Sequence, residues 1–136
     1  MTTPAGYSGT PLARKLGVKT DGRALIVAAP AGFDLEDLPS GAVVHRRAGA
    51  ASYDVILAFC PDLDRLRSRL ATNMPRMTTA GAIWLAWPKR ASGVATDLDE
   101  NVVRDQGLAT GLVDVKVAAI DATWAALKFV RRVRDR

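Results

Sequence analysis

Apolar residues gather in short runs along this chain, and turn residues or segments of helical spacing separate the runs. Four such runs cover residues 24–29, 42–45, 53–59 and 81–87. Runs of this length bounded by Gly and Pro are typical of strands buried on both faces of a parallel sheet. One helical stripe follows the third run and consists of Leu63, Leu66, Leu70 and Met74. Strands and helices are therefore predicted to alternate, which indicates an α/β protein.

Two further helices and a closing hairpin complete the pattern. Thr10 as N-cap and Pro11 at the first helical position predict a short helix that Gly17 ends. Asp97 is predicted to cap another helix, with Glu100 three residues on. Valines alternate with polar residues over 113–117, and a turn of about three residues precedes the last strand, 124–130. These two strands are expected to be antiparallel because a parallel crossover needs about a dozen residues.

These elements predict one α/β domain over residues 1–136, with three layers. Its sheet is expected to be mostly parallel and Rossmann-like, with helices on both faces and an antiparallel C-terminal hairpin. Residues 1–9 and the basic tail, 131–136, are expected to be less ordered. Trp84 and Trp87 lie three positions apart in one strand, so they are expected on opposite faces of the sheet.

Composition narrows the class of protein. Hydrophobic residues make up 49% and charged residues 24%, as in ordinary globular domains. One Cys and one His exclude an internal disulfide and predict no metal site. The start of the chain has neither a basic nor an apolar segment of the signal-peptide kind, and no apolar stretch approaches a membrane span. The protein is therefore expected in the cytoplasm, without a membrane partner.

The positive net charge of the chain makes nucleic acid a candidate partner. The formal net charge is +5 and the pI is near 9.9, a footprint that nucleic-acid-binding domains share. The basic residues form small separate groups, however, and aromatic residues make up only 6%. Binding of single strands relies on aromatic residues interleaved with basic ones. Any nucleic-acid binding is therefore expected to be weak and non-specific and to depend on the tail.

Two resemblances appear in these residues. The stretch 53–57, the helix after it, 79–84 and the closing hairpin are similar to the second half of a Rossmann-like methyltransferase. Nearly the whole chain resembles a family of small bacterial proteins known only as a domain of unknown function. That second resemblance rests on residues 6–12, 87–98, 107–114 and 124–129. It implies the fold but brings no established activity and no chemistry.

The nucleotide-binding features of a methyltransferase are missing from the sequence. Such a fold carries a glycine-rich loop after the first strand and a carboxylate at the end of the second, which binds ribose hydroxyls. Here the loop, 28–33, has one glycine, Gly32, and the second strand ends in Arg46 and Arg47. No cofactor is therefore predicted, and S-adenosylmethionine is expected not to bind.

The segment after the fourth apolar run is the candidate ligand site. It leaves the carboxyl end of a buried strand, where open α/β sheets bind ligands. Its candidate binding residues are Lys89, Arg90, Ser92, Gly93 and Thr96, and Gly32 and Cys60 are expected on the same rim. The alternative is a simple connector, since Asp97 and its acidic neighbours oppose an anion. A Cys60–His45 nucleophile and base is disfavoured, because a third strand is expected between theirs.

Taken together, the residues favour a non-catalytic or degenerate domain that binds a small anionic ligand or a protein partner, which includes a second copy of itself. The first alternative is a small-molecule transferase with a divergent cofactor site. The second is a weak nucleic-acid-associated protein. The sequence leaves open whether the chain is an enzyme, and fold resemblance alone does not decide function.

Overall fold

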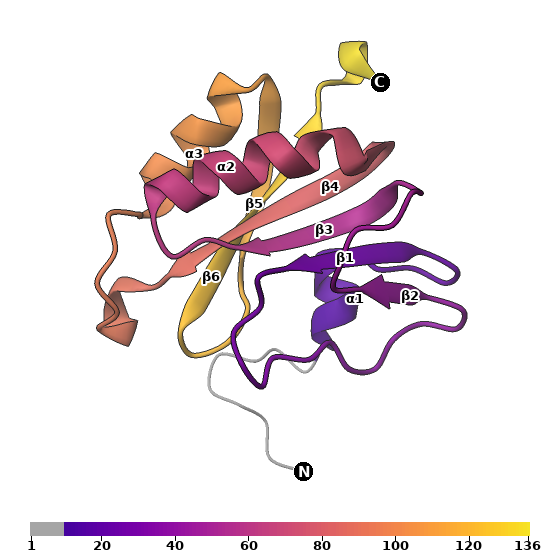
Figure 1. Cartoon of the computed structure of the whole chain (residues 1–136), viewed down its shortest axis with the longest axis horizontal. Helices are drawn as coiled ribbons and strands as arrows, with labels where there is room; N and C mark the ends of the chain where they lie inside the picture. The colour runs from indigo at the N-terminus through magenta and orange to yellow at the C-terminus, as the bar shows by residue number, and fades with distance from the viewer. Residues whose placement is uncertain (1–9) are drawn as a thin grey trace.

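A computed structural model describes residues 10–136 as one mixed sheet with helices on both faces (Figure 1). The expectation for residues 1–9 lies outside the described residues. The six strands are β1 (Arg23–Val27), β2 (Val43–His45), β3 (Tyr53–Phe59), β4 (Met77–Pro88), β5 (Leu112–Ala119) and β6 (Trp124–Arg131). The α-helices are α1 (Leu12–Leu16), α2 (Leu63–Asn73) and α3 (Glu100–Ala109), and short 3-10 turns cover Met74–Arg76, Arg90–Ser92 and Val133–Asp135.

The strand order is β2-β1-β3-β4-β6-β5. β1 to β4 pair in parallel, whereas β6 is antiparallel to both β4 and β5. The α/β class, the mostly parallel sheet and the antiparallel end are therefore confirmed. The turn of residues 120–123 between β5 and β6 is too short for a parallel crossover, which explains the reversal.

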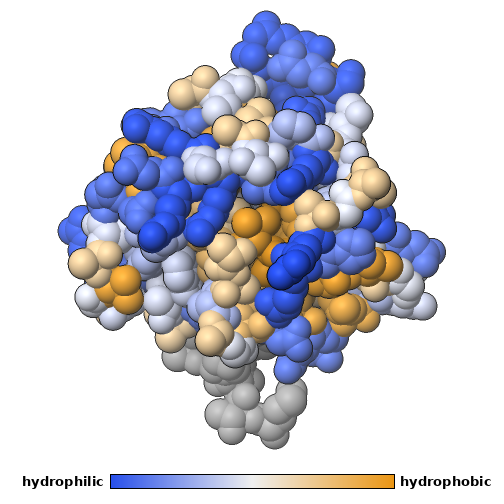
Figure 2. All heavy atoms as spheres, viewed as in Figure 1, coloured by the Kyte–Doolittle hydropathy of each residue, from blue (hydrophilic) through white to orange (hydrophobic). Residues whose placement is uncertain are grey.

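A hydrophobic core lies on each face of the sheet. On one face, Leu66 and Leu70 of α2 are buried against β3 and β4, and Val103 of α3 is buried where that helix packs on β5 and β6. On the other face, Ala13 and Leu16 of α1 are buried against β1 and β3. In Figure 2, hydrophilic residues dominate the upper part of the first face, where α2 and α3 lie, and hydrophobic residues show in its centre. Within residues 10–136, the five residues of α1 are the only α-helix on the second face.

The two tryptophans of β4 confirm the predicted alternation. Trp84 is fully buried in the core on the α1 face, and Trp87 is buried in the core on the α2 and α3 face. The indole N–H of Trp84 donates to the backbone oxygen of Leu16, 3.0 Å away. This hydrogen bond satisfies the buried donor and fixes the end of α1 on the sheet.

The predicted helix starts were wrong by one or two residues. The N-cap of α3 is Asp99, whose carboxylate accepts from the backbone N–H of Val102 at 2.8 Å. Asp97 instead accepts from the N–H of Leu63 at 2.9 Å, at the start of α2. A cap needs its carboxylate two or three residues before the N–H that it accepts from, and only Asp99 meets this condition in α3. In α1 the N-cap is Pro11 rather than Thr10.

The basic tail has local structure. Arg132 and Asp135 form an ion pair at 3.0 Å, and the Arg136 side chain donates to the backbone oxygen of Arg131 at 3.1 Å. These contacts hold the 3-10 turn that follows β6, in the segment expected to be less ordered. Across residues 10–136, none of the helices has the length and apolar character that a membrane crossing requires.

Candidate functional site

The predicted rim at the carboxyl edge of the sheet consists of two separate hollows. The β1-edge hollow, of about 470 Å³, lies between α1, the β1–β2 loop and the β5–β6 turn, and Gly32 lines it. The β4-edge hollow, of about 600 Å³, lies between the β4–α3 loop, α3 and β5. Four of the predicted residues line it: Lys89, Arg90, Gly93 and Thr96.

The expectation of one shared pocket is therefore wrong. Leu12 and Ile120 place the β1-edge hollow on the α1 face of the sheet, while Trp87 and Leu98 place the β4-edge hollow on the opposite face. In addition, β3 lies between β1 and β4. Sequence periodicity predicts which strands end at this edge, but not on which face each following loop packs.

The two hydroxyl groups of the predicted site stabilise the loop that carries them. Ser92 Oγ donates to the backbone oxygen of Lys89 at 2.6 Å and accepts from the N–H of Val94 at 3.2 Å. Thr96 Oγ1 donates to the backbone oxygen of Pro61 at 2.8 Å and accepts from the N–H of Leu98 at 3.1 Å. Both hydroxyls thus already hold a donor and an acceptor.

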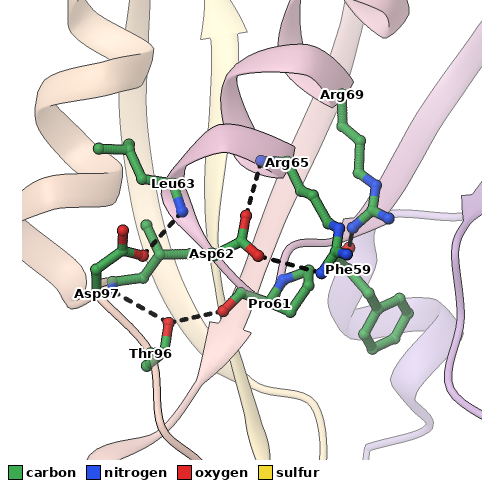
Figure 3. A network of polar contacts seen from close by, with 9 residues as sticks. Phe59, Pro61, Asp62, Leu63, Arg65, Arg69, Thr96 and Asp97 are labelled. Carbon is green, nitrogen blue, oxygen red and sulfur yellow. Dashed lines mark hydrogen bonds and ion pairs between the residues drawn. The ribbon is translucent and has the colours of Figure 1, made fainter.

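Carboxylates occupy the N-terminus of α2 beside this loop (Figure 3). Asp62 accepts from the N–H of Arg65 at 2.9 Å and pairs with the Arg65 guanidinium at 3.1 Å. Asp97 reaches the same helix start from the β4–α3 loop and accepts from Leu63. These N–H groups, which attract anions at free helix starts, are therefore already bonded here.

Charge in the β4-edge hollow is mixed. Its lining carries the cations Lys89 and Arg90 together with the acids Asp97, Asp99 and Glu100. Anion binding at Lys89–Thr96 stays a prediction, but the local acids oppose it.

Cys60 is the buried member of the predicted rim. Its Sγ donates to the backbone oxygen of Ala58 at 3.5 Å. Burial raises the pKa of this thiol to about 12, although the nearby Arg69 acts in the opposite direction. His45 is bonded elsewhere, with Nδ1 2.7 Å from Tyr53 Oη. At neutral pH the Cys60 thiol is therefore protonated and has no base next to it.

The β1-edge hollow has an acidic lining that the sequence analysis did not single out. Asp34, Glu36 and Asp37 come from the β1–β2 loop, Asp121 comes from the β5–β6 turn, and Lys15 of α1 is the one cation in the lining. The sequence contains one local sign of this acidic lining, because three acids fall within four residues of a loop. The contribution of Asp121 depends on tertiary structure, because it lies more than eighty residues further along the chain.

The hydrogen bonds of these side chains separate fixed acids from available ones. Asp34 accepts from the N–H of Leu35 at 2.9 Å and pairs with Arg46 at 3.5 Å. Asp121 Oδ1 accepts from the backbone N–H groups of Thr123 and Trp124, each at 2.8 Å. The side-chain carboxylates of Glu36 and Asp37, by contrast, have no hydrogen-bond or ion-pair partner within residues 10–136.

The backbone at this edge differs from a dinucleotide-binding loop. Such a loop leads from the first strand into a helix whose N-terminus holds the pyrophosphate. Here, residues 28–42 contain no helix. Ala28 lies in the left-handed region at φ 57°, where glycine is favoured. Arg46, just after β2, donates to the backbone oxygen of Phe33 at 2.6 Å, so the cation that replaces the expected ribose-binding acid lies against the loop.

The described part of the chain has no cluster of side chains that could hold a metal ion. Between residues 10 and 136, no three side chains of His, Cys, Asp or Glu are placed to hold one metal ion.

Solved structures similar to this chain include several methyltransferases. A methyltransferase from Pyrococcus furiosus is 14% identical, with a TM-score of 0.55 over 98% of this chain and 88% of that one. DhpI, solved as a complex with SAH, is 12% identical, with a TM-score of 0.63 over 91% and 83%. The glycopeptide N-methyltransferase MtfA, complexed with sinefungin, is 11% identical, with a TM-score of 0.56 over 89% and 84%.

Sequence comparison adds no closer relation. No family model matches this chain, and no curated protein does. The resemblance to a family of unknown function therefore stays a prediction. At identities of 10 to 16%, the likeness to the solved structures shows the fold and does not show the chemistry. The chain has the Rossmann-like fold of these methyltransferases.

Proposed function

We propose that this chain is a small-molecule-binding domain built on a methyltransferase fold, and that its ligand is a small organic cation held in the β1-edge hollow. The observation that carries the proposal is the position of Glu36 and Asp37, two carboxylates without a partner within residues 10–136, in the wall of a hollow at the carboxyl end of β1. Open α/β sheets bind ligands at this edge. A volume of about 470 Å³ suits a small molecule.

The charge of the lining supports a cation. The lining holds four carboxylates and one ammonium group, that of Lys15, which donates to the backbone oxygen of Ala119 at 3.4 Å, and Arg46 outside the lining pairs with one of the four, Asp34. A concave surface with charge of one sign concentrates ions of the other sign. Leu12 and Phe33 add apolar surface to the same wall, so an amine with an aliphatic or aromatic part matches the lining.

The second candidate is a transferase that uses S-adenosylmethionine through a divergent site. Two observations favour it: the fold is that of the solved methyltransferases, and the acidic hollow lies next to the loop that follows β1. The missing helix after β1 and the position of Arg46 count against it.

A thermal-shift series with three probes tests both candidates. Putrescine has two ammonium groups on a short aliphatic chain and no nucleoside. S-adenosylmethionine has a sulfonium charge and a nucleoside, and S-adenosylhomocysteine has the nucleoside without the sulfonium charge. We expect putrescine to stabilise the protein, by about 2.7 kcal/mol at 100 times its dissociation constant, and salt to weaken the effect, whereas S-adenosylmethionine is expected not to bind. Equal stabilisation by S-adenosylmethionine and S-adenosylhomocysteine, without putrescine, would instead support the transferase.

Two double variants, each of which removes two negative charges, test whether the β1-edge hollow is the binding site. The double variant Glu36→Gln, Asp37→Asn is expected to lose the response to putrescine. The double variant Asp64→Asn, Asp105→Asn removes the same charge from exposed positions on α2 and α3 and is expected to keep it. A wild-type protein that no cation stabilises, or an unchanged response in the first variant, contradicts the proposal.

A further inference from the structure

A third hollow opens at the opposite edge of the sheet and has a different character. It encloses about 450 Å³ on the α1 face, where β1 and β3 begin and β6 ends. We refer to it as the Lys128 hollow, after its central side chain. Its lining includes Leu16, Lys19, Thr20, Thr78, Lys128 and Val130. The hollow exists because α1 ends at Leu16 and leaves the neighbouring part of β6 uncovered.

Lys128 extends from β6 across the indole ring of Trp84. The two residues are cross-strand partners, and the Lys128 ammonium lies 5.9 Å from the centre of the indole ring. The aliphatic stem of a lysine covers apolar surface in this way while its charge remains outside. The ammonium group is therefore held at a defined place in the wall of the hollow.

The electrostatic surroundings of Lys128 are unfavourable to its charge. Burial lowers its pKa first, and the positive charges of Lys116 on β5 and Lys19 after α1 lower it further. Within residues 10–136, no carboxylate lies within ion-pair distance of its ammonium group. Lys19 and Lys128 thus line the hollow together, and Lys116 acts on Lys128 from outside the lining.

Two acids, Asp21 and Asp54, line the same hollow. Asp54 accepts from the backbone N–H of Arg23 at 3.0 Å and from the hydroxyl of Thr78 at 3.3 Å. Asp21 lies against Gly41, where an added Cβ would be 1.9 Å from its Oδ1. Asp21 and Asp54 are the acids facing Lys128, and Lys19 and Lys116 are the cations. Within residues 10–136, neither acid forms an ion pair with Lys19 or Lys128.

We propose that the Lys128 hollow binds a small oxyanion, a carboxylate or a phosphate, with the Lys128 ammonium as its central ligand. An anion placed there relieves the repulsion among the three lysines and gains charge-assisted hydrogen bonds. The hydroxyl of Thr20 lines the same space and adds a neutral donor. This site does not depend on the β1-edge hollow, which lies at the other edge of the sheet and prefers charge of the opposite sign.

Lysine side-chain NMR tests the proposal directly. The Cε and Hε signals of all lysines are titrated with pH in chloride, in inorganic phosphate and in acetate, at matched ionic strength. Because an oxyanion binds the ammonium form, bound phosphate or acetate must raise the pKa of Lys128 by linkage. The comparison of the phosphate and acetate arms shows which oxyanion is preferred. A pKa of Lys128 that responds no more than that of Lys15, in the β1-edge hollow, overturns the proposal.

Three variants separate binding from packing. Lys128→Met keeps an aliphatic stem over Trp84 and is expected to weaken phosphate binding by about tenfold or more, the effect of one lost charged hydrogen bond. Lys128→Arg retains the charge and is expected to retain binding. Lys15→Met removes a lysine elsewhere and is expected to bind phosphate like the wild type. Equal phosphate affinity in Lys128→Met and the wild type shows that Lys128 only covers the indole.

Discussion

Gly107 offers a test of how tightly α3 packs on the sheet. It lies inside the helix and is buried, facing Phe129 of β6. A Cβ added at Gly107 would lie 2.0 Å from Cε1 and 2.3 Å from Cζ of the Phe129 ring. Since Phe129 is fully buried, its ring has no solvent space to move into. We therefore expect Gly107→Ala to destabilise the protein, although alanine favours a helix.

The magnitude follows from two opposing effects. Replacing glycine by alanine inside a helix stabilises by about 1 kcal/mol, whereas forcing an extra methyl group into a packed core typically costs about 1–3 kcal/mol. A contact of 2.0 Å requires a shift of the ring or of the helix axis, which places the cost at the upper end. The net loss in free energy of unfolding is expected to be about 1–2 kcal/mol.

Urea unfolding of five proteins measures this effect. They are the wild type, Gly107→Ala, Phe129→Leu and the double variant, with Leu108→Ala as an exposed control on the same helix. The two single losses should add to more than the loss in the double variant, because a smaller side chain at 129 makes room for the methyl group. A Gly107→Ala protein as stable as the wild type would refute the reasoning, since it would mean that helix propensity outweighs the clash.

Three further outcomes are expected. Tyr53→Phe removes the hydroxyl that bonds His45 and Gly49 and should lower the unfolding free energy by about 1–2 kcal/mol in urea; no loss would show that water replaces the hydroxyl. Asp97→Ala should cost about 1 kcal/mol, as for a lost helix cap, and hydrogen exchange should show opening at the start of α2 rather than of α3. Cys60 should resist thiol reagents in the folded protein. Its stabilising contribution should fall between pH 9 and 12, because the unfolded chain releases the thiol proton first, and Cys60→Ala should remove that part of the pH dependence.

The sequence alone determined the strands, the class of the sheet and the faces of its central strand. Continuous apolar runs can be satisfied only by burial on both faces, so β1 and β3 were predictable in kind and nearly in extent, whereas β4 begins at Met77, four residues before the predicted run. The three-residue spacing of Trp84 and Trp87 settled their opposite faces for the same geometric reason. The short turn before β6 required an antiparallel end.

Tertiary structure alone decided which residues meet at each hollow. Asp97 lies close to α3 in sequence but accepts from the N–H of Leu63 at the start of α2, because the β4–α3 loop folds back across the start of that helix. Asp121 joins the acids of the β1–β2 loop only through the β5–β6 turn, and Lys128 reaches a hollow only because α1 is short. Periodicity reports the environment of each residue along its own element. The direction in which a loop packs depends on contacts between segments distant in sequence, which no local pattern records.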